Sequence, residues 1–197
     1  MASAPPDPTA GKSIPDLRRL TPGPSFDTVR RVLQGDSDAA AALLAAAHLD
    51  FTLQTAITDL FIGSALDKND RLFGGGAPLQ STEAKMHLCY GLGIIGPATR
   101  DDITSICAIR NLFAHTPIPL DFKVEAIKNK CTAMKAIEAY QAAGIYKISD
   151  LPFSKTDARV AFVNTCLGIS LMISIIRKIQ PDGTLKISLS FRQPDLP

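Results

Sequence analysis

An arginine, an asparagine and a histidine lie within six consecutive residues of the sequence, as Arg110, Asn111 and His115. Histidine titrates near neutral pH and can act as a general acid or base, while a fixed guanidinium neutralises negative charge that develops on a phosphate. The chain has only three histidines. The spacing therefore favours either acid–base chemistry at a phosphate or the binding of a charged ligand or partner.

The element that positions these residues is a helix that we predict over residues 103–114. Ile103, Ile106 and Phe113 recur at helical spacing and give it a buried side. Two prolines shortly after residue 115 do not allow the helix to continue far. Thr99 and Asp102 form a variant of the capping box ahead of it. The polar residues are therefore expected at the carboxyl end of a helix.

Arg110 and His115 are about 140° apart around an ideal helix. They converge on one ligand only if the helix end turns or if a second chain contributes. Otherwise Arg110 pairs with Asp101, Asp102 or Asp121, and His115 caps the carboxyl end of the helix. The sequence leaves both interpretations open.

The same periodic analysis predicts further helices along the chain, separated by turns. The longest opens at Asp36 or Ser37 as its cap and continues through an alanine run of very high helix propensity. Three consecutive glycines and a proline predict a loop at residues 72–78. Ser154 and Asp157 open the last long helix. The predicted helices are residues 25–33, 38–62, 81–92, 103–114, 121–144 and 155–179.

The two ends of the chain differ from its middle in composition and in the pattern of apolar residues. Residues 1–24 contain six prolines and little apolar surface, which predicts a disordered arm. After a turn at residues 180–183, apolar and polar residues alternate over 185–191, which is typical of a strand. The expected organisation is an arm (1–24), one helical domain (25–180) and a tail with a strand-like segment (181–197).

Composition restricts the function. Of 197 residues, 46% are hydrophobic and 20% charged, as in ordinary globular proteins, and the net charge is only +2. This charge is too small for a large nucleic-acid surface, so we expect no direct DNA binding. The start of the chain lacks a secretory pattern, which predicts a cytoplasmic protein. The apolar segment 160–176 contains several polar residues and is predicted to be a core helix rather than a membrane span.

The remaining polar groups indicate no metal site or cofactor. The four cysteines are widely separated among apolar residues and are predicted to be free and buried. His48 and His87 are not spaced with a second metal ligand. The lysines of the predicted helix 121–144 are interrupted by Glu125 and Glu138, which is typical of a solvated face. They are Lys123, Lys128, Lys130 and Lys135.

Two resemblances are carried by these residues. Arg110, Asn111 and His115 resemble the Arg-x4-6-His motif of the HEPN superfamily. An ordered series of motifs resembles the mannitol operon repressor (MtlR) family over residues 35–122. The series comprises the stretch 35–50, then Leu72-Phe73, Pro78-Leu79, Ala84-Lys85, Tyr90, residues 92–95, Arg100-Asp101-Asp102 and the final stretch 109–115.

The resemblance implies an all-α bundle, of about six helices by our periodic analysis, related to HEPN bundles and without a DNA-reading helix-turn-helix. It also implies a transcriptional regulator that acts through contacts with another protein. Thr82 stands where the MtlR family often has an aromatic residue, and Lys85 where it often has arginine. Lysine cannot form the bidentate contact of arginine, so a ligand or partner recognised there would differ.

We therefore expect a regulatory protein whose binding residues include Arg110, Asn111, His115, Lys85 and Tyr90. The alternative implied by the HEPN motif is a metal-independent endoribonuclease in which Arg110, His115 and Asn111 are catalytic, at a cleft where two protomers meet. A homo-oligomer is compatible with both hypotheses. RNA is a substrate only under the second.

Overall fold

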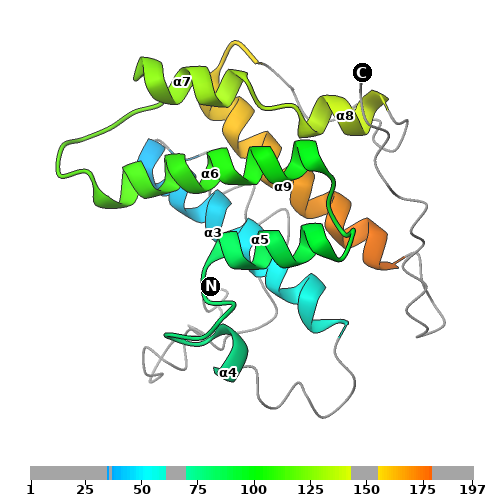
Figure 1. Ribbon diagram of the computed structural model, residues 1–197. Coiled ribbons are helices and arrows are strands. Elements are labelled where there is room, and N and C mark those ends of the chain that lie inside the picture. Colours follow the sequence, from blue (N-terminus) through cyan, green and yellow to red (C-terminus); the bar gives the residue numbers. More distant parts are fainter. Residues whose placement is uncertain (1–34, 36, 61–69, 143–154, 179–197) are drawn as a thin grey trace, which may run out of the picture.

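The structure is a computed structural model that describes residues 35, 37–60, 70–142 and 155–178. Within these ranges every regular element is an α-helix, which confirms the predicted all-α class (Figure 1). The predicted helix 25–33, the arm 1–24 and the strand-like segment 185–191 lie outside the described residues. The helices are α3 (Asp38–Thr58), α4 (Asp70–Phe73), α5 (Thr82–Gly91), α6 (Pro97–His115), α7 (Glu125–Thr132), α8 (Ala136–Ala142) and α9 (Ala158–Lys178).

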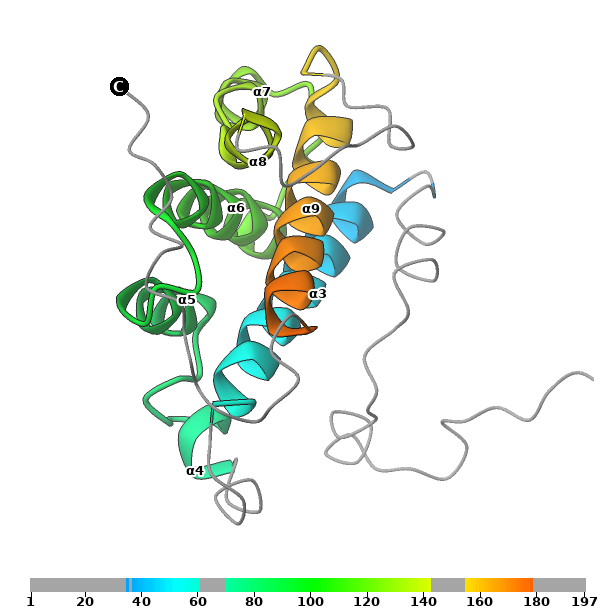
Figure 2. The same ribbon diagram turned by 90° about the vertical axis from the view of Figure 1, so that its right-hand side faces the viewer.

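Helices α3 and α9 lie side by side and run in the same direction through the bundle, as the two views show (Figures 1 and 2). Ser37 caps α3, its Oγ accepting a hydrogen bond from the amide of Ala40, as the sequence predicted. The amino-terminal ends of the two helices are joined by an ion pair in which Arg159 Nη1 lies 3.1 Å from Asp38 Oδ1. Helix α9 begins at residue 158 rather than 155, because Asp157 accepts from the amide of Val160.

Helices α5 and α6 form an antiparallel hairpin that covers one side of α3 (Figure 2). The chain turns between them at Gly93, whose φ of 73° is favourable only for glycine. The observed α6 is longer than predicted, because Pro97 occupies the first helical position, where its missing amide costs nothing. The predicted capping box is wrong. Thr99 lies inside the helix, and its hydroxyl shares a 2.6 Å hydrogen bond with the Tyr140 hydroxyl.

The predicted helix over residues 121–144 is in fact two helices, α7 and α8, separated at residues 133–135. The buried carboxylate of Asp102 on α6 accepts hydrogen bonds from the amides of Lys135 at 2.9 Å and Ala136 at 2.7 Å. These amides form the free amino-terminal end of α8, which needs acceptors. The break therefore depends on a side chain 33 residues away in the sequence.

The glycine-rich segment is a loop only in part. Leu72 and Phe73 belong to the short helix α4, and the loop begins at Gly74. The amide of Leu79 donates to the carbonyl of Leu72 at 2.8 Å, and Gly76 has a φ of 79°. The predicted loop 72–78 was therefore wrong at its first two residues, where hydrogen bonding to the returning chain closes a turn.

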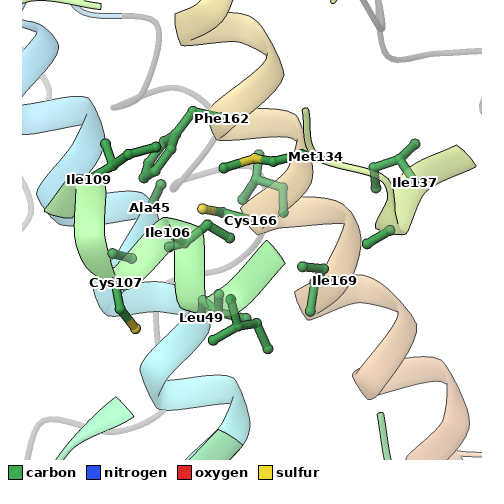
Figure 3. Close-up of a cluster of buried hydrophobic side chains, with 14 of the residues drawn as sticks. Ala45, Leu49, Ile106, Cys107, Ile109, Met134, Ile137, Phe162, Cys166 and Ile169 are labelled. Atoms are coloured by element: carbon green, nitrogen blue, oxygen red, sulfur yellow. The ribbon is translucent and has the colours of Figure 1, made fainter. Parts of the chain in front are cut away.

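The core lies where α3, α6 and α9 meet, with α7 and α8 closing one end (Figure 3). Rings of Phe113, Phe122 and Phe162 are in successive contact, with centroids 5.1 and 5.4 Å apart. All four cysteines are free and buried, as predicted. The buried core side chains include Ala45, Leu49, Ile106, Cys107, Ile109, Met134, Ile137, Phe162, Cys166 and Ile169.

Among the described helices, α3 alone is long and apolar enough to cross a membrane by length and composition. Half of that apolar window is buried inside the bundle, against α5, α6 and α9. The apolar segment 160–176 falls within α9, where the side chains of residues 164–170 are all buried. The apolar character of both helices is thus accounted for largely by core packing.

Candidate functional site

The residues of the Arg110 motif lie on the last turns of α6, and all three are exposed. Arg110 Nη1 donates to Asn111 Oδ1 at 3.0 Å. The helix stays regular through His115, where the amide of Thr116 still donates to the carbonyl of Leu112. Because the helix end does not turn, no hydrogen bond joins Arg110 to His115 among the described residues.

Each of the three aspartates that the sequence suggested as partners of Arg110 binds another group. Asp101 Oδ1 lies 2.7 Å from Nη2 of Arg100, and Asp102 accepts from the start of α8. Asp121 accepts from the amide of Lys123. Arg110 forms no ion pair with any described residue, so its charge is available to solvent or to a partner.

Lys85, predicted as a binding residue, lies buried between α3 and α5. Its Nζ is 2.6 Å from Asp50 Oδ2, and the hydroxyl of Thr82 donates to Asp50 Oδ1 at 2.7 Å. Thr82 and Lys85 are the two positions that depart from the MtlR-like pattern, and here they share one carboxylate. Together they supply the two donors that a single arginine could give to a carboxylate. This geometry favours a structural role for Lys85.

Tyr90, also predicted as a binding residue, is exposed at the other end of the α5–α6 hairpin. The guanidinium of Arg100 lies 4.8 Å from the centre of its ring, close enough for a cation–π interaction. Arg100 precedes Arg110 by ten residues on α6, which is about 15 Å along a helix. The five predicted binding residues are therefore divided among three places, of which the end of α6 holds Arg110, Asn111 and His115.

The structure adds exposed apolar residues beside this motif that the sequence did not reveal. Leu112 is 41% exposed, Ile118 64% and Val124 39%. Leu112 lies on α6, and Ile118 and Val124 lie in the connection from α6 to α7, which the ring contact between Phe113 and Phe122 holds against the end of α6. Ile118 stands between two prolines in the connection, which was the one sequence signal of its exposure.

Cations are also exposed on α6, on α7 and in the connection between them. Arg110, Lys123 and Lys130 are exposed and form no ion pair with the described residues, while Lys128 lies 3.9 Å from Glu125. The four lysines predicted to form a solvated face are all exposed. Arg110 and Leu112 are about 160° apart around the regular helix α6, so these exposed charged and apolar residues do not share one face of it.

The groups that could ligate a metal are dispersed. Within the described ranges, no three histidine, cysteine, aspartate or glutamate side chains come together as a metal-binding group. Burial shifts the pKa values of several titratable side chains, among them Asp102 and the half-buried His48. Burial raises the pKa of Asp102 to about 6 despite the two amides that bind it, and burial lowers the pKa of His48, whose Nδ1 has no hydrogen-bond partner among the residues that the structure describes.

Comparison with known proteins gives a likeness of fold. No protein-family model matches the sequence, and no curated protein matches it. The structure is similar to a chain of the MtlR–HPr complex from Escherichia coli, with a TM-score of 0.55 and 18% identity over 77% of this chain and 99% of that one. It is also similar to YggD from Shigella flexneri 2a, described as a possible transcriptional regulator, with a TM-score of 0.54 and 15% identity over 79% and 98% of the two chains.

At these identities the likeness concerns the fold alone. It agrees with the MtlR-like helical architecture expected from the sequence motifs. The matched structures are covered almost completely by this chain, so the correspondence is not limited to one helical hairpin.

Proposed function

We propose that this protein is a cytoplasmic regulator that controls transcription by binding another protein, without reading DNA itself. The observation that carries the proposal is the MtlR-like fold, and the exposed Arg110, Asn111 and His115 at the end of α6 leave the last of the MtlR-like motifs open to a partner. One of the similar structures is a complex with a second protein, HPr. Protein contact is therefore the mode of action that we infer for this chain.

The charge of the molecule supports indirect action on DNA. The net charge is +2, and Lys128, one of the two exposed lysines of α7, lies 3.9 Å from Glu125. DNA-binding proteins depend on a concentrated positive surface for contacts with phosphates. A protein of this charge gains little from such contacts at physiological salt.

Two measurements test the proposal. Deletion of the gene should change the transcript levels of a defined set of genes, whereas the purified protein alone should not bind their promoters above nonspecific affinity at physiological salt. HPr from the same organism is the first partner to test, by calorimetry. Specific promoter binding by the purified protein alone, or an unchanged transcript profile, would contradict the proposal.

A metal-independent ribonuclease is the second candidate. It is favoured by the exposure of Arg110, Asn111 and His115 on one helix end, where a phosphate could reach them. Since Arg110 and His115 diverge on a regular helix, a second protomer would have to complete the catalytic pair. For this reason we rank it below the regulator.

A further inference from the structure

Helix α3 lies at the edge of the bundle and presents an apolar face outward (Figure 2). Ala40, Leu43, Leu44 and Ala47 are exposed on this face, and Phe51 is half-buried. These positions fall within an arc of about 100° and extend over about 16 Å, on the side of the helix opposite its buried residues. The exposed side of a surface helix ordinarily carries charged and polar residues. A face of this composition indicates that another element covers it.

The chain that precedes α3 is fixed close to this face. Arg159 on α9 donates from Nη2 to the carbonyl of Gly35 and from Nη1 to Asp38 Oδ1 at 3.1 Å. Gly35 is therefore held where α3 and α9 begin. On α9, none of the described side chains of residues 158–174 is exposed. Of these two helices, it is thus α3 that leaves an apolar face open to the chain preceding Gly35.

Residues 25–33, which lie outside the described part of the chain, have the sequence of an amphipathic helix. Their apolar residues Phe26, Val29, Val32 and Leu33 fall on one side of a helix, within about 120°, while Arg31 lies about 160° from Val29. A helix of this length spans about 14 Å, close to the extent of the α3 face. Residues 34–37 leave a loop of the length that joins antiparallel helices.

We propose that residues 25–33 form a helix that docks antiparallel on the outward face of α3 and packs its apolar side on Leu43 and Leu44. The small side chains of Ala40 and Ala47 let the two helices approach closely. The short loop keeps this segment at a high effective concentration beside α3, which favours it over a second copy of the chain. The contact does not depend on the proposed function, and it removes this face from the surface that is open to a partner protein.

Cysteine cross-linking in the full-length protein tests the contact. Val29→Cys is combined in turn with Leu43→Cys and Leu44→Cys, and mild oxidation should join the two positions within one chain. The four native cysteines are buried and do not compete. Arg31→Cys with the same partners is the matched control and should cross-link at least tenfold more slowly, because Arg31 faces away from α3.

Leu44→Gln measures whether the face is covered. If residues 25–33 pack on it, this substitution should lower the melting temperature by about 4 °C or more, because apolar burial is lost. Leu112→Gln on α6 is the matched control, since Leu112 is 41% exposed and Leu44 is 43% exposed. It should change the melting temperature by less than about 2 °C.

A second copy of the chain on this face would give a different result. Leu44→Cys alone would then cross-link two chains, and the melting temperature of the wild type would rise with protein concentration. That outcome would overturn the proposal. It would also be overturned by the absence of a cross-link within one chain, by equal cross-linking rates for Val29→Cys and Arg31→Cys, or by equal effects of Leu44→Gln and Leu112→Gln.

Discussion

At the scale of single residues, Asp102 has an unusual environment for a carboxylate. It is 4% exposed, and its two acceptor bonds hold the start of α8 against α6. Burial raises its pKa from 3.8 to about 6, because desolvation disfavours the charged form more than the two amides favour it. The stability of the junction between α6 and α8 should therefore depend on pH through Asp102.

The sign of this link follows from proton binding. The folded protein binds the Asp102 proton more tightly than the unfolded chain does, so protonation of Asp102 increases the free energy of unfolding. This increase is fully present below pH 3.8 and is lost as the pH rises through about 6. We expect the stability of the wild type relative to Asp102→Asn to increase by on the order of 2 kcal/mol between pH 7 and pH 4.

Urea denaturation of both proteins across this pH range measures the difference. His48 titrates with the opposite sign, since burial lowers its pKa, but it is present in both proteins and its contribution cancels. Asp102→Ala should cost roughly 2 kcal/mol near neutral pH because two amides at the start of α8 lose their acceptor. A stability difference between wild type and Asp102→Asn that does not vary with pH would contradict the link.

The Arg110 motif allows a direct decision between the two candidate functions. If the protein is a regulator, neither the wild type nor His115→Ala cleaves total cellular RNA in EDTA, and this is the result we expect. If it is a HEPN-type nuclease, the wild type cleaves without metal, and His115→Ala abolishes cleavage while remaining folded. His87→Ala is the matched control, since His87 is also exposed but lies on α5. Cleavage lost only in His115→Ala would reverse our ranking.

At the scale of elements, the contact between α3 and α5 depends on one buried charge. Lys85 is 2% exposed, and Asp50 is its counter-ion. A buried ammonium that loses its partner is costly, whereas an apolar replacement of similar length removes both the charge and the need for a partner. The interaction therefore predicts strong coupling between the two positions.

We expect Asp50→Ala to lower the free energy of unfolding by about 3 kcal/mol, and Lys85→Met to change it by less than about 1 kcal/mol. The double variant should be close to Lys85→Met alone. A double-mutant cycle by chemical denaturation measures the coupling. Asp101→Ala provides the exposed comparison and should cost much less than Asp50→Ala, because the Arg100–Asp101 pair is screened by solvent. Additive effects of the two buried substitutions would show that the pair is not coupled.

At the scale of the whole molecule, the four cysteines report on the cooperativity of the fold. They are distributed over α5, α6, α7 and α9, and all are buried. Burial raises the pKa of Cys89 and Cys131 to about 12 and, with the nearby carboxylates of Glu83 and Asp50, that of Cys107 to about 11. Thiolates, which are the reactive species, are therefore scarce in the folded protein near pH 8.

Alkylation followed by mass spectrometry should be at least a hundredfold slower in the native protein than in concentrated guanidinium chloride. Cys107 should react first, since it is 8% exposed while Cys89 and Cys166 are fully buried. The remaining three should react together, at the rate set by global opening. Rapid native labelling of Cys166 would mean that α9 opens independently of the rest of the bundle.

The sequence by itself determined the features that depend on neighbouring residues. Apolar spacing predicted the helical class and most of α3, α5, α6 and α9, since one face of each must be buried. The Ser37 cap and the burial of the cysteines followed from local pattern as well. The candidate motif at residues 110–115 was also visible, because its residue types and spacing are local.

Tertiary structure decided the features that depend on residues far apart in the chain. Asp102 accepts hydrogen bonds from the amides of residues 135 and 136, and this divides the predicted helix 121–144 into two. Asp50 forms an ion pair with Lys85, whose side chain is therefore buried rather than exposed. A regular helix end keeps Arg110 and His115 apart, while the packing of Phe122 against Phe113 holds the connection that carries Ile118 against α6. Buried carboxylates and aromatic contacts of this kind satisfy long-range partners, which helical periodicity does not encode.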